Sequence, residues 1–101
     1  MLKGLAMNMP KVLRCDVDEC AYNVQKVCHA LAITIGDPAG GAKCDTFFSA
    51  AQKGGDMGAT AKVGACKVMQ CRYNQSFECT AGSIQVGLEE DQADCLTFQQ
   101  R

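Results

Sequence analysis

Three short stretches of the chain alternate apolar and polar residues, which is the pattern of a β-strand with one buried face. They are VLRCDV at 12–17, LAITIG at 31–36 and SIQVG at 83–87. In the last two stretches the apolar side chains would share one face: Ile33 with Ile35, and Ile84 with Val86. The pattern predicts a β-containing, loop-rich fold made of short strands.

Glycine interrupts this pattern in the middle of the chain. The segment 48–61, FSAAQKGGDMGATA, contains the pair Gly54-Gly55, which indicates a flexible joint. Just before it, Asp45 is placed to cap a short helix over 46–53 that Gly54 would end. We therefore expect a short helix that runs into a flexible joint.

The cysteines on the two sides of this segment repeat. When the chain is displaced by 51 residues, the interval from Cys15 to Cys66, all eight cysteines coincide as two sets with the spacing C-x4-C-x7-C-x15-C. The sets are Cys15, Cys20, Cys28 and Cys44, and Cys66, Cys71, Cys79 and Cys95. Equal gaps without insertion indicate a tandem repeat. The predicted boundaries are a leader at 1–10, a first copy at 11–47, a linker at 48–61, a second copy at 62–98 and a tail at 99–101.

Each copy is too small to be stabilised easily by apolar burial alone. Units of fewer than about 40 residues usually need disulfides, a metal ion or oligomerisation. The chain has no Trp, four Phe and two Tyr, so large core side chains are scarce, whereas cysteine makes up 8 of 101 residues. We therefore expect two tandem, cysteine-stapled modules.

Four cysteines per copy suit a zinc ion. Zn²⁺ accepts a tetrahedral set of four thiolates, and the C-x4-C gap lies within the usual range for ligand pairs. A structural zinc ion contributes about 10 to 16 kcal/mol in small peptides, against about 2 to 4 kcal/mol for a disulfide. A site filled by four cysteines leaves no position for substrate, as in structural sites. Disulfides remain an alternative, and mononuclear iron is chemically possible, although the common iron–sulfur spacings are missing.

Three residues beside the cysteines are further candidates. Tyr22 and Asn23 recur 51 residues later, so we expect the tyrosine to pack beside the metal and the asparagine to make a turn through left-handed backbone or an Asx hydrogen bond. His29 is the only histidine and is replaced by Thr80 in the second copy. A surface role for His29 is therefore favoured over a ligand role.

Charge and hydropathy limit the partners. The first residues lack the apolar core of a secretory signal, and no stretch approaches the roughly 18 apolar residues of a membrane span. We expect a soluble, cytoplasmic protein, where cysteines at fixed spacing favour metal over disulfides. Lys and Arg number 10 against 11 Asp and Glu, scattered without a basic stripe, so we expect neither nucleic acid nor membrane as a partner.

The residues around the cysteines also carry a family resemblance. The pattern CDVDECAYNVQKVCHA, ITIG and CDTF, met again as CKVMQCRYNQSFECTA, IQVG and CLTF, resembles the DUF1540 family. The resemblance implies short domains whose cysteines are thought to bind zinc, and hence a metal-binding role for all eight cysteines. It implies no assigned function.

The function predicted from the sequence is that of a non-enzymatic module that binds two Zn²⁺ ions, one per copy, in a structural or protein-interaction role. The alternatives are a metal-handling or thiol redox protein and a disulfide-stapled module. An enzyme is disfavoured because there is no second histidine and no glycine-rich phosphate loop. Because the gaps are equal and a glycine-containing joint separates the copies, we expect each copy to fold on its own.

Overall fold

The computed structural model describes residues 9–36, 42–89 and 92–101, a part of the chain in which the regular elements are short strands. They are β1 (Lys11–Cys15), β2 (Asn23–Val24), β3 (Val27–Cys28), β4 (Ala32–Gly36), β5 (Lys43–Cys44), β6 (Lys62–Cys66), β7 (Asn74–Gln75), β8 (Glu78–Cys79), β9 (Ser83–Glu89) and β10 (Gln92–Cys95). None of the described residues is helical, so the helix predicted over 46–53 is wrong. It follows that these ranges contain no helix capable of spanning a membrane.

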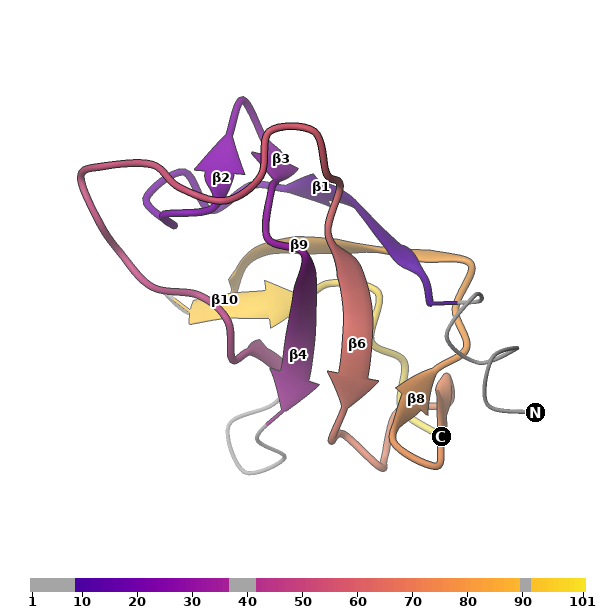
Figure 1. Ribbon diagram of the computed structural model, residues 1–101. Helices are drawn as coiled ribbons and strands as arrows, with labels where there is room; N and C mark the ends of the chain where they lie inside the picture. Colours follow the sequence, from indigo (N-terminus) through magenta and orange to yellow (C-terminus); the bar gives the residue numbers. More distant parts are fainter. Residues whose placement is uncertain (1–8, 37–41, 90–91) are drawn as a thin grey trace.

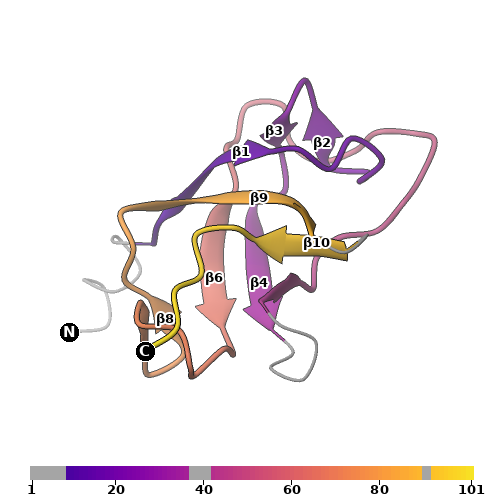
Figure 2. The same cartoon turned by 180° about the vertical axis from the view of Figure 1, so that it is seen from behind.

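Six of the strands close into one barrel. Their order is β1-β6-β4-β5-β10-β9, and β9 returns to pair with β1. In Figure 1, β4 and β6 lie side by side, and β9 passes behind them. Figure 2, seen from behind, brings β1, β9 and β10 to the near side. Two small hairpins, β2 with β3 and β7 with β8, stand outside the barrel.

The strands predicted from the alternating pattern are present, and their apolar faces line the core. β1, β4 and β9 cover most of the three stretches. The alternating residues of β4 and β9 are almost completely buried: Ile33, Ile35, Ile84 and Val86. The core that they form with Val12, Val17 and Val63 is one cluster that contains residues of both copies. Burial of these aliphatic side chains is the main apolar contribution to stability in a chain with few aromatic residues.

The barrel strands of one copy pair with strands of the other. β1 of the first copy runs parallel to β9 of the second, with Val12 opposite Ile84. In the equivalent pairing, β6 of the second copy runs parallel to β4 of the first, with Val63 opposite Ile33. Among the described residues, neither β1 nor β6 pairs with a barrel strand of its own copy. This pairing argues against the expectation that each copy folds alone, because a single copy would leave its first strand unpaired.

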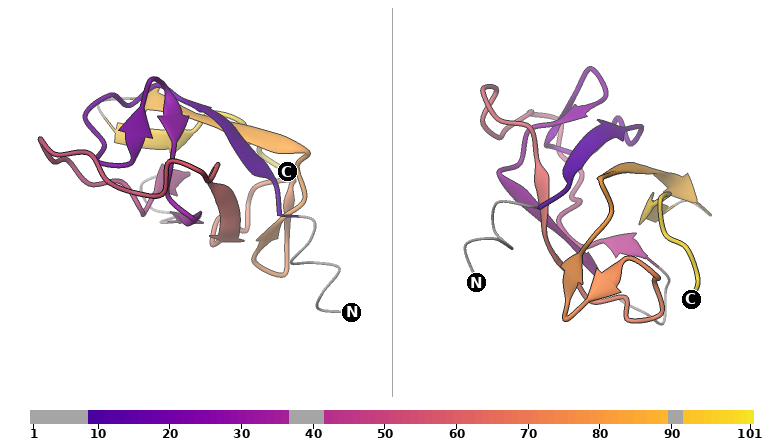
Figure 3. Two further views of the ribbon diagram at one scale, coloured as in Figure 1. Left: turned by 45° about the horizontal axis from the view of Figure 1, so that its top comes forward. Right: turned by 90° about the vertical axis from the view of Figure 1, so that its right-hand side faces the viewer.

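An approximate two-fold rotation relates the two copies. Lys11 faces Lys62 where β1 meets β6, and Lys43 faces Asp94 where β5 meets β10. Both pairs join positions that are 51 residues apart, so each copy presents the same position to its counterpart, as at the interface of a symmetric dimer. Figure 3 shows the hairpins of the two copies at opposite ends of the barrel.

The linker lies along the first copy and is not a free joint. Asp56 and Ala61 donate backbone hydrogen bonds to the carbonyl oxygens of His29 and Cys28, at 2.9 and 3.1 Å. Gly55 has a φ of 98°, and a Cβ atom there would lie 2.5 Å from the carbonyl oxygen of His29. Glycine is needed at this position for close approach of the backbone, not for flexibility.

Candidate metal centres

Strand ends and one bridge position the cysteines. In the first copy, Cys15, Cys28 and Cys44 are the last residues of β1, β3 and β5, and Cys20 forms an isolated bridge with Ser49. In the second copy, Cys66, Cys79 and Cys95 are the last residues of β6, β8 and β10. Cys71 forms an isolated bridge with Gln100. The repeated unit thus includes the residues just after each copy, which the sequence assigned to the linker and the tail.

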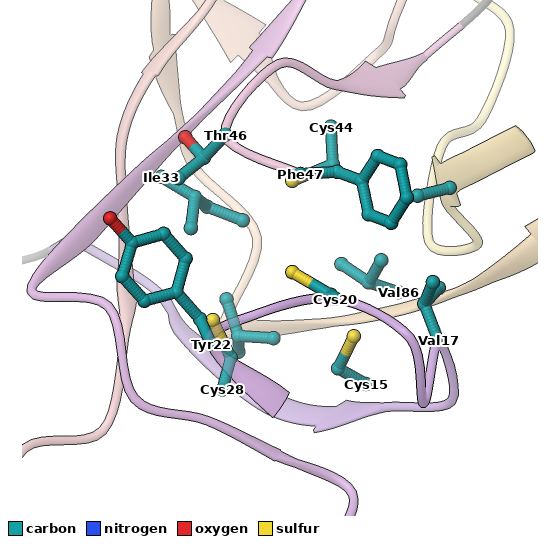
Figure 4. Close-up of a pocket in the computed structure, with 12 residues that line it drawn as sticks. Cys15, Val17, Cys20, Tyr22, Cys28, Ile33, Cys44, Thr46, Phe47 and Val86 are labelled. Carbon is teal, nitrogen blue, oxygen red and sulfur yellow. The ribbon is translucent and has the colours of Figure 1, made fainter. Parts of the chain in front are cut away.

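The four cysteines of each copy line one small cavity. We call the cavity lined by Cys15, Cys20, Cys28 and Cys44 the first centre, and the cavity lined by Cys66, Cys71, Cys79 and Cys95 the second centre. Figure 4 shows the thiols of the first centre around this space, with Tyr22 and Phe47 beside them. The structure groups the thiols as the repeat predicts, while their role as ligands stays a prediction.

The walls of each centre come from both copies. Val86 and Ala93 of the second copy line the first centre, and Ile35 and Ala42 of the first copy line the second. No local pattern in the sequence predicts these contacts, because they depend on the exchanged pairing of β1 with β9 and of β4 with β6. All four thiols of a centre therefore come from one copy, whereas the apolar residues around them come from both copies.

The size of the two cavities limits what they can hold. Their volumes are about 10 Å³ at the first centre and about 20 Å³ at the second. A space of roughly 10 to 15 Å³ holds one water-sized particle, whereas organic ligands occupy pockets of about 300 to 1,000 Å³. Each centre therefore has room for a single small ion and for no organic substrate.

A buried asparagine ties two of the cysteine-bearing segments together. Asn23 Nδ2 donates to the carbonyl oxygen of Cys15 at 2.7 Å, and Asn23 Oδ1 accepts from the Lys26 amide at 3.2 Å. Asn74 makes the same two bonds in the second copy, at 2.8 and 3.3 Å. The predicted side-chain hydrogen bond to the turn backbone is confirmed. The asparagines do not have left-handed backbone.

The left-handed residues lie at the tips of the two small hairpins. Gln25 and Lys26 have φ values of 54° and 68°, and Ser76 and Phe77 repeat them. Positive φ at both central residues is the mark of a type I′ turn, which matches the twist of a two-stranded hairpin. The carbonyl of Lys26 accepts from the Cys15 amide at 3.0 Å, so the turn holds the hairpin against the end of β1.

Burial controls the protonation of the thiols in the metal-free protein. It raises the pKa of Cys44 and of Cys95 to about 11, and it raises the pKa of Cys15, Cys28 and Cys79. Nearby thiols of the same copy add a smaller repulsion in the same direction, since two thiolates close together disfavour each other. These five cysteines are therefore neutral thiols near pH 7 when no cation is bound.

Backbone amides oppose this effect by donating to the sulfurs. The amides of Val17, Ala30 and Thr46, each two residues after a cysteine, are hydrogen-bonded to the sulfurs of Cys15, Cys28 and Cys44 and lower their pKa. The same offset recurs in the second copy, at Ala81 and Thr97. Such donors stabilise thiolates and fix the orientation of metal ligands. These hydrogen bonds therefore stabilise the thiolate form of the cysteines when a bound cation offsets the cost of burying the negative charge.

Four thiols per centre suit a thiophilic ion in number and chemistry, but their sulfur atoms are not yet close enough to coordinate one. All eight cysteines are free thiols. Across the described ranges, however, no three cysteine, histidine or acidic side chains stand close enough to form a metal-binding group as they are. The sulfurs of each copy surround a shared space, and closure around an ion would need further convergence of their side chains.

Tyrosine and histidine have packing roles in the structure. Tyr22 lines the first centre, and its ring meets Phe48 edge to face, with centroids 5.4 Å apart. The half-buried His29 is joined through Nδ1 to the carbonyl oxygen of Ala59 at 3.0 Å, so it fastens the linker and does not line the centre. The predicted packing of Tyr22 is confirmed. The prediction of a surface role for His29 missed its contact with the linker.

The described residues form a cysteine-rich β-barrel to which both copies contribute strands, with one cavity lined by four thiols in each copy. Residues 13–47 and 65–98 both match the profile of the Domain of Unknown Function family DUF1540, and the chain belongs to that family, with two tandem copies. Comparisons with curated proteins and with solved structures found no match.

Proposed function

We propose that the protein is a non-enzymatic tandem module in which the four cysteines of each copy bind one Zn²⁺ ion and the barrel serves a structural or protein-interaction role. The observation that carries this proposal is that the four thiols of each copy line a cavity of single-ion size. Backbone amides directed at the sulfurs add to it, because they favour the thiolate form that a metal ion needs.

The chemistry of the donors favours zinc over harder cations. Thiolates select soft or borderline ions, and a tetrahedral set of four sulfurs is a common structural zinc site. Four protein ligands would leave no coordination position for water or substrate, so the centres support a structural role rather than hydrolysis. Iron in the same four-sulfur set is the chemical alternative that metal analysis would distinguish.

Two rival functions use the same thiols. A metal-handling or thiol redox protein would release the ion or oxidise its cysteines, and the partial exposure of Cys79 and Cys95 favours that rival at the second centre only. A disulfide-stapled module would need paired cysteines, whereas all eight are free here. We prefer the zinc module because four thiols of one copy line an ion-sized cavity in each half of the chain.

The surface is better suited to a protein partner than to nucleic acid. Four thiolates and one Zn²⁺ ion add a charge of −2 per centre, which takes the formal charge of the chain from −1 to −5. A negative field disfavours phosphate backbones, whose affinity for proteins comes largely from Lys and Arg. Several large apolar side chains are exposed and available for protein contact: Leu13, Leu31, Phe48, Met57, Met69, Phe77, Leu88 and Leu96.

Native mass spectrometry combined with a thiol count tests the proposal. We expect two metal ions on the intact protein, and eight alkylated cysteines after chelation and unfolding without a reductant. Elemental analysis of the same sample identifies the metal. A protein that carries no metal after purification and after incubation with Zn²⁺, and whose unfolded cysteines resist alkylation, would instead be a disulfide-stapled module.

A further inference from the structure

The two centres have the same ligands but different surroundings. We infer that the second centre, formed by Cys66, Cys71, Cys79 and Cys95, loses its metal ion to a small chelator in solution faster than the first centre does. This inference rests on the proposed zinc binding and assigns different roles to the two copies. The exchange is a ligand substitution: the ion leaves bound to the acceptor, and the freed thiolates take up protons from water.

Burial of the ligands differs between the copies. All four cysteines of the first centre are buried, whereas Cys79 and Cys95 of the second are partly exposed. Their counterparts at equivalent positions are Cys28 and Cys44. An incoming chelator must reach a metal-bound sulfur or the ion itself, so partial exposure of two ligands gives it a shorter path at the second centre.

Each centre is lined by a tyrosine and a phenylalanine, but the tyrosine contacts a further aromatic ring in only one copy. In the first copy, Tyr22 packs edge to face against Phe48. In the second copy Tyr73 also lines its centre, but the position equivalent to Phe48 is Gln99, which is exposed and hydrogen-bonded through its side chain to Arg72 at 3.3 Å. The second tyrosine therefore lacks the ring that holds the first one in place.

A backbone hydrogen bond to the third cysteine of the first copy, Cys28, has no equivalent at Cys79 in the second copy. In the first copy, the Ala61 amide donates to the carbonyl oxygen of Cys28 at 3.1 Å. The equivalent of Ala61 is Pro10, which has no N–H and cannot donate to the carbonyl oxygen of Cys79. The positions of Pro10 and Ala61 are structurally equivalent, because each carbonyl accepts at 2.9 Å from the first β-strand of the other copy, at Val63 and Val12.

The contrast is local and does not reflect a generally looser second copy. In both copies, the loop between the first and second cysteines accepts a hydrogen bond from a cationic side chain that lies after the fourth cysteine. Lys53 Nζ donates to the carbonyl oxygen of Asp18 at 2.5 Å, and Arg101 Nε donates to that of the equivalent Met69 at 2.9 Å. Among the described residues, the differences between the two centres thus lie at Cys79, Cys95 and Tyr73, where an acceptor would enter.

Competition with the coloured chelator 4-(2-pyridylazo)resorcinol tests this inference on the full chain loaded with Zn²⁺. We expect two phases of one ion each. The first should be roughly tenfold faster or more, since one backbone hydrogen bond and one aromatic contact each change a local opening equilibrium several-fold. Alkylation at the end of the fast phase, followed by peptide mass spectrometry, should label the cysteines of the second centre.

A matched pair of exposed substitutions tests the physical cause. Gln99→Phe should slow the fast phase about fivefold by restoring an aromatic contact, and Phe48→Gln should speed the slow phase by a similar factor. Labelling of the first centre before the second, or release of both ions in one phase, would overturn the inference and leave zinc binding intact. A chain that binds no zinc at all would overturn the proposed function and this inference together.

Discussion

The cysteine loops bring together thiols of one copy, whereas the barrel includes strand pairs between the two copies. All four thiols around a centre belong to one copy, and the asparagine that joins their loops belongs to the same copy. The strands behind them do the opposite, because β1 pairs with β9 and β4 pairs with β6 across the copies. One copy of the repeat therefore supplies all the thiols of a centre, whereas the barrel is formed by strands of both copies.

This contrast follows from the distances along the chain. The cysteines of one copy lie within 30 residues of each other, so short hairpins and turns bring them together. The pair formed by Val12 and Ile84 joins residues more than 70 positions apart. Such non-local pairing forms late and depends on the whole chain. A substitution in a barrel strand should thus destabilise both copies, whereas a substitution in a cysteine loop should first affect the centre of its own copy.

Truncation should have the largest effect. We expect residues 1–54, which contain the first cysteine set and lack β6 and β9, not to fold as a monomer even with excess Zn²⁺, because β1 loses both of its partners. Circular dichroism and analytical ultracentrifugation of the fragment and the full chain measure this. A folded monomeric fragment that binds one ion would show that the copies are independent after all.

A core substitution sharpens the same comparison. Ile84→Ala should destabilise the protein by about 3 kcal/mol, the typical cost of a large-to-small change in a packed core. Because Ile84 of the second copy lies opposite Val12 of the first, the denaturation curve should move as one transition. The exposed variant Leu31→Ala is the control. Two separated transitions, with only one displaced, would contradict the shared barrel.

Loss of the buried asparagine should cost less and act first on one centre. Asn23→Ala removes the hydrogen bonds to the Cys15 carbonyl and the Lys26 amide, which we expect to cost about 2 kcal/mol because both backbone groups lose a partner. Urea denaturation measures the loss, and Asn74→Ala is the matched variant in the second copy. A variant that weakens zinc binding at both centres by the same factor, relative to the unmodified chain, would show that each loop acts on more than its own centre.

The smallest expected effect is a pH dependence of the metal-free protein. Burial raises the pKa of Cys44 and Cys95 from the ordinary 9.0 to about 11. The folded state therefore prefers the neutral thiols, and the stability that this preference contributes is fully present below pH 9 and is lost as the pH rises from 9 to 11. Thermal unfolding should show this decline without metal and lack it when Zn²⁺ is bound. A melting temperature of the metal-free protein that rises across this window would contradict the assigned burial.

Part of this architecture could be predicted from the sequence, and the reasons for the rest are physical. The alternation of Ile33 and Ile35 correctly predicted a strand with one buried face, and the cysteine spacing correctly grouped the thiols by copy. Alternation specifies which face of a strand is buried and not which strand lies beside it, so it does not predict the pairing between copies. Composition alone cannot distinguish a flexible joint from close backbone approach, so the sequence does not reveal the role of Gly55.

Cadmium-113 NMR of the full chain with cadmium in place of zinc tests the central claim most directly, because scalar coupling links each ion to the cysteines that bind it. We predict two resonances, one coupled only to the β-protons of Cys15, Cys20, Cys28 and Cys44 and the other only to those of Cys66, Cys71, Cys79 and Cys95. An ion coupled to cysteines of both copies would contradict the account.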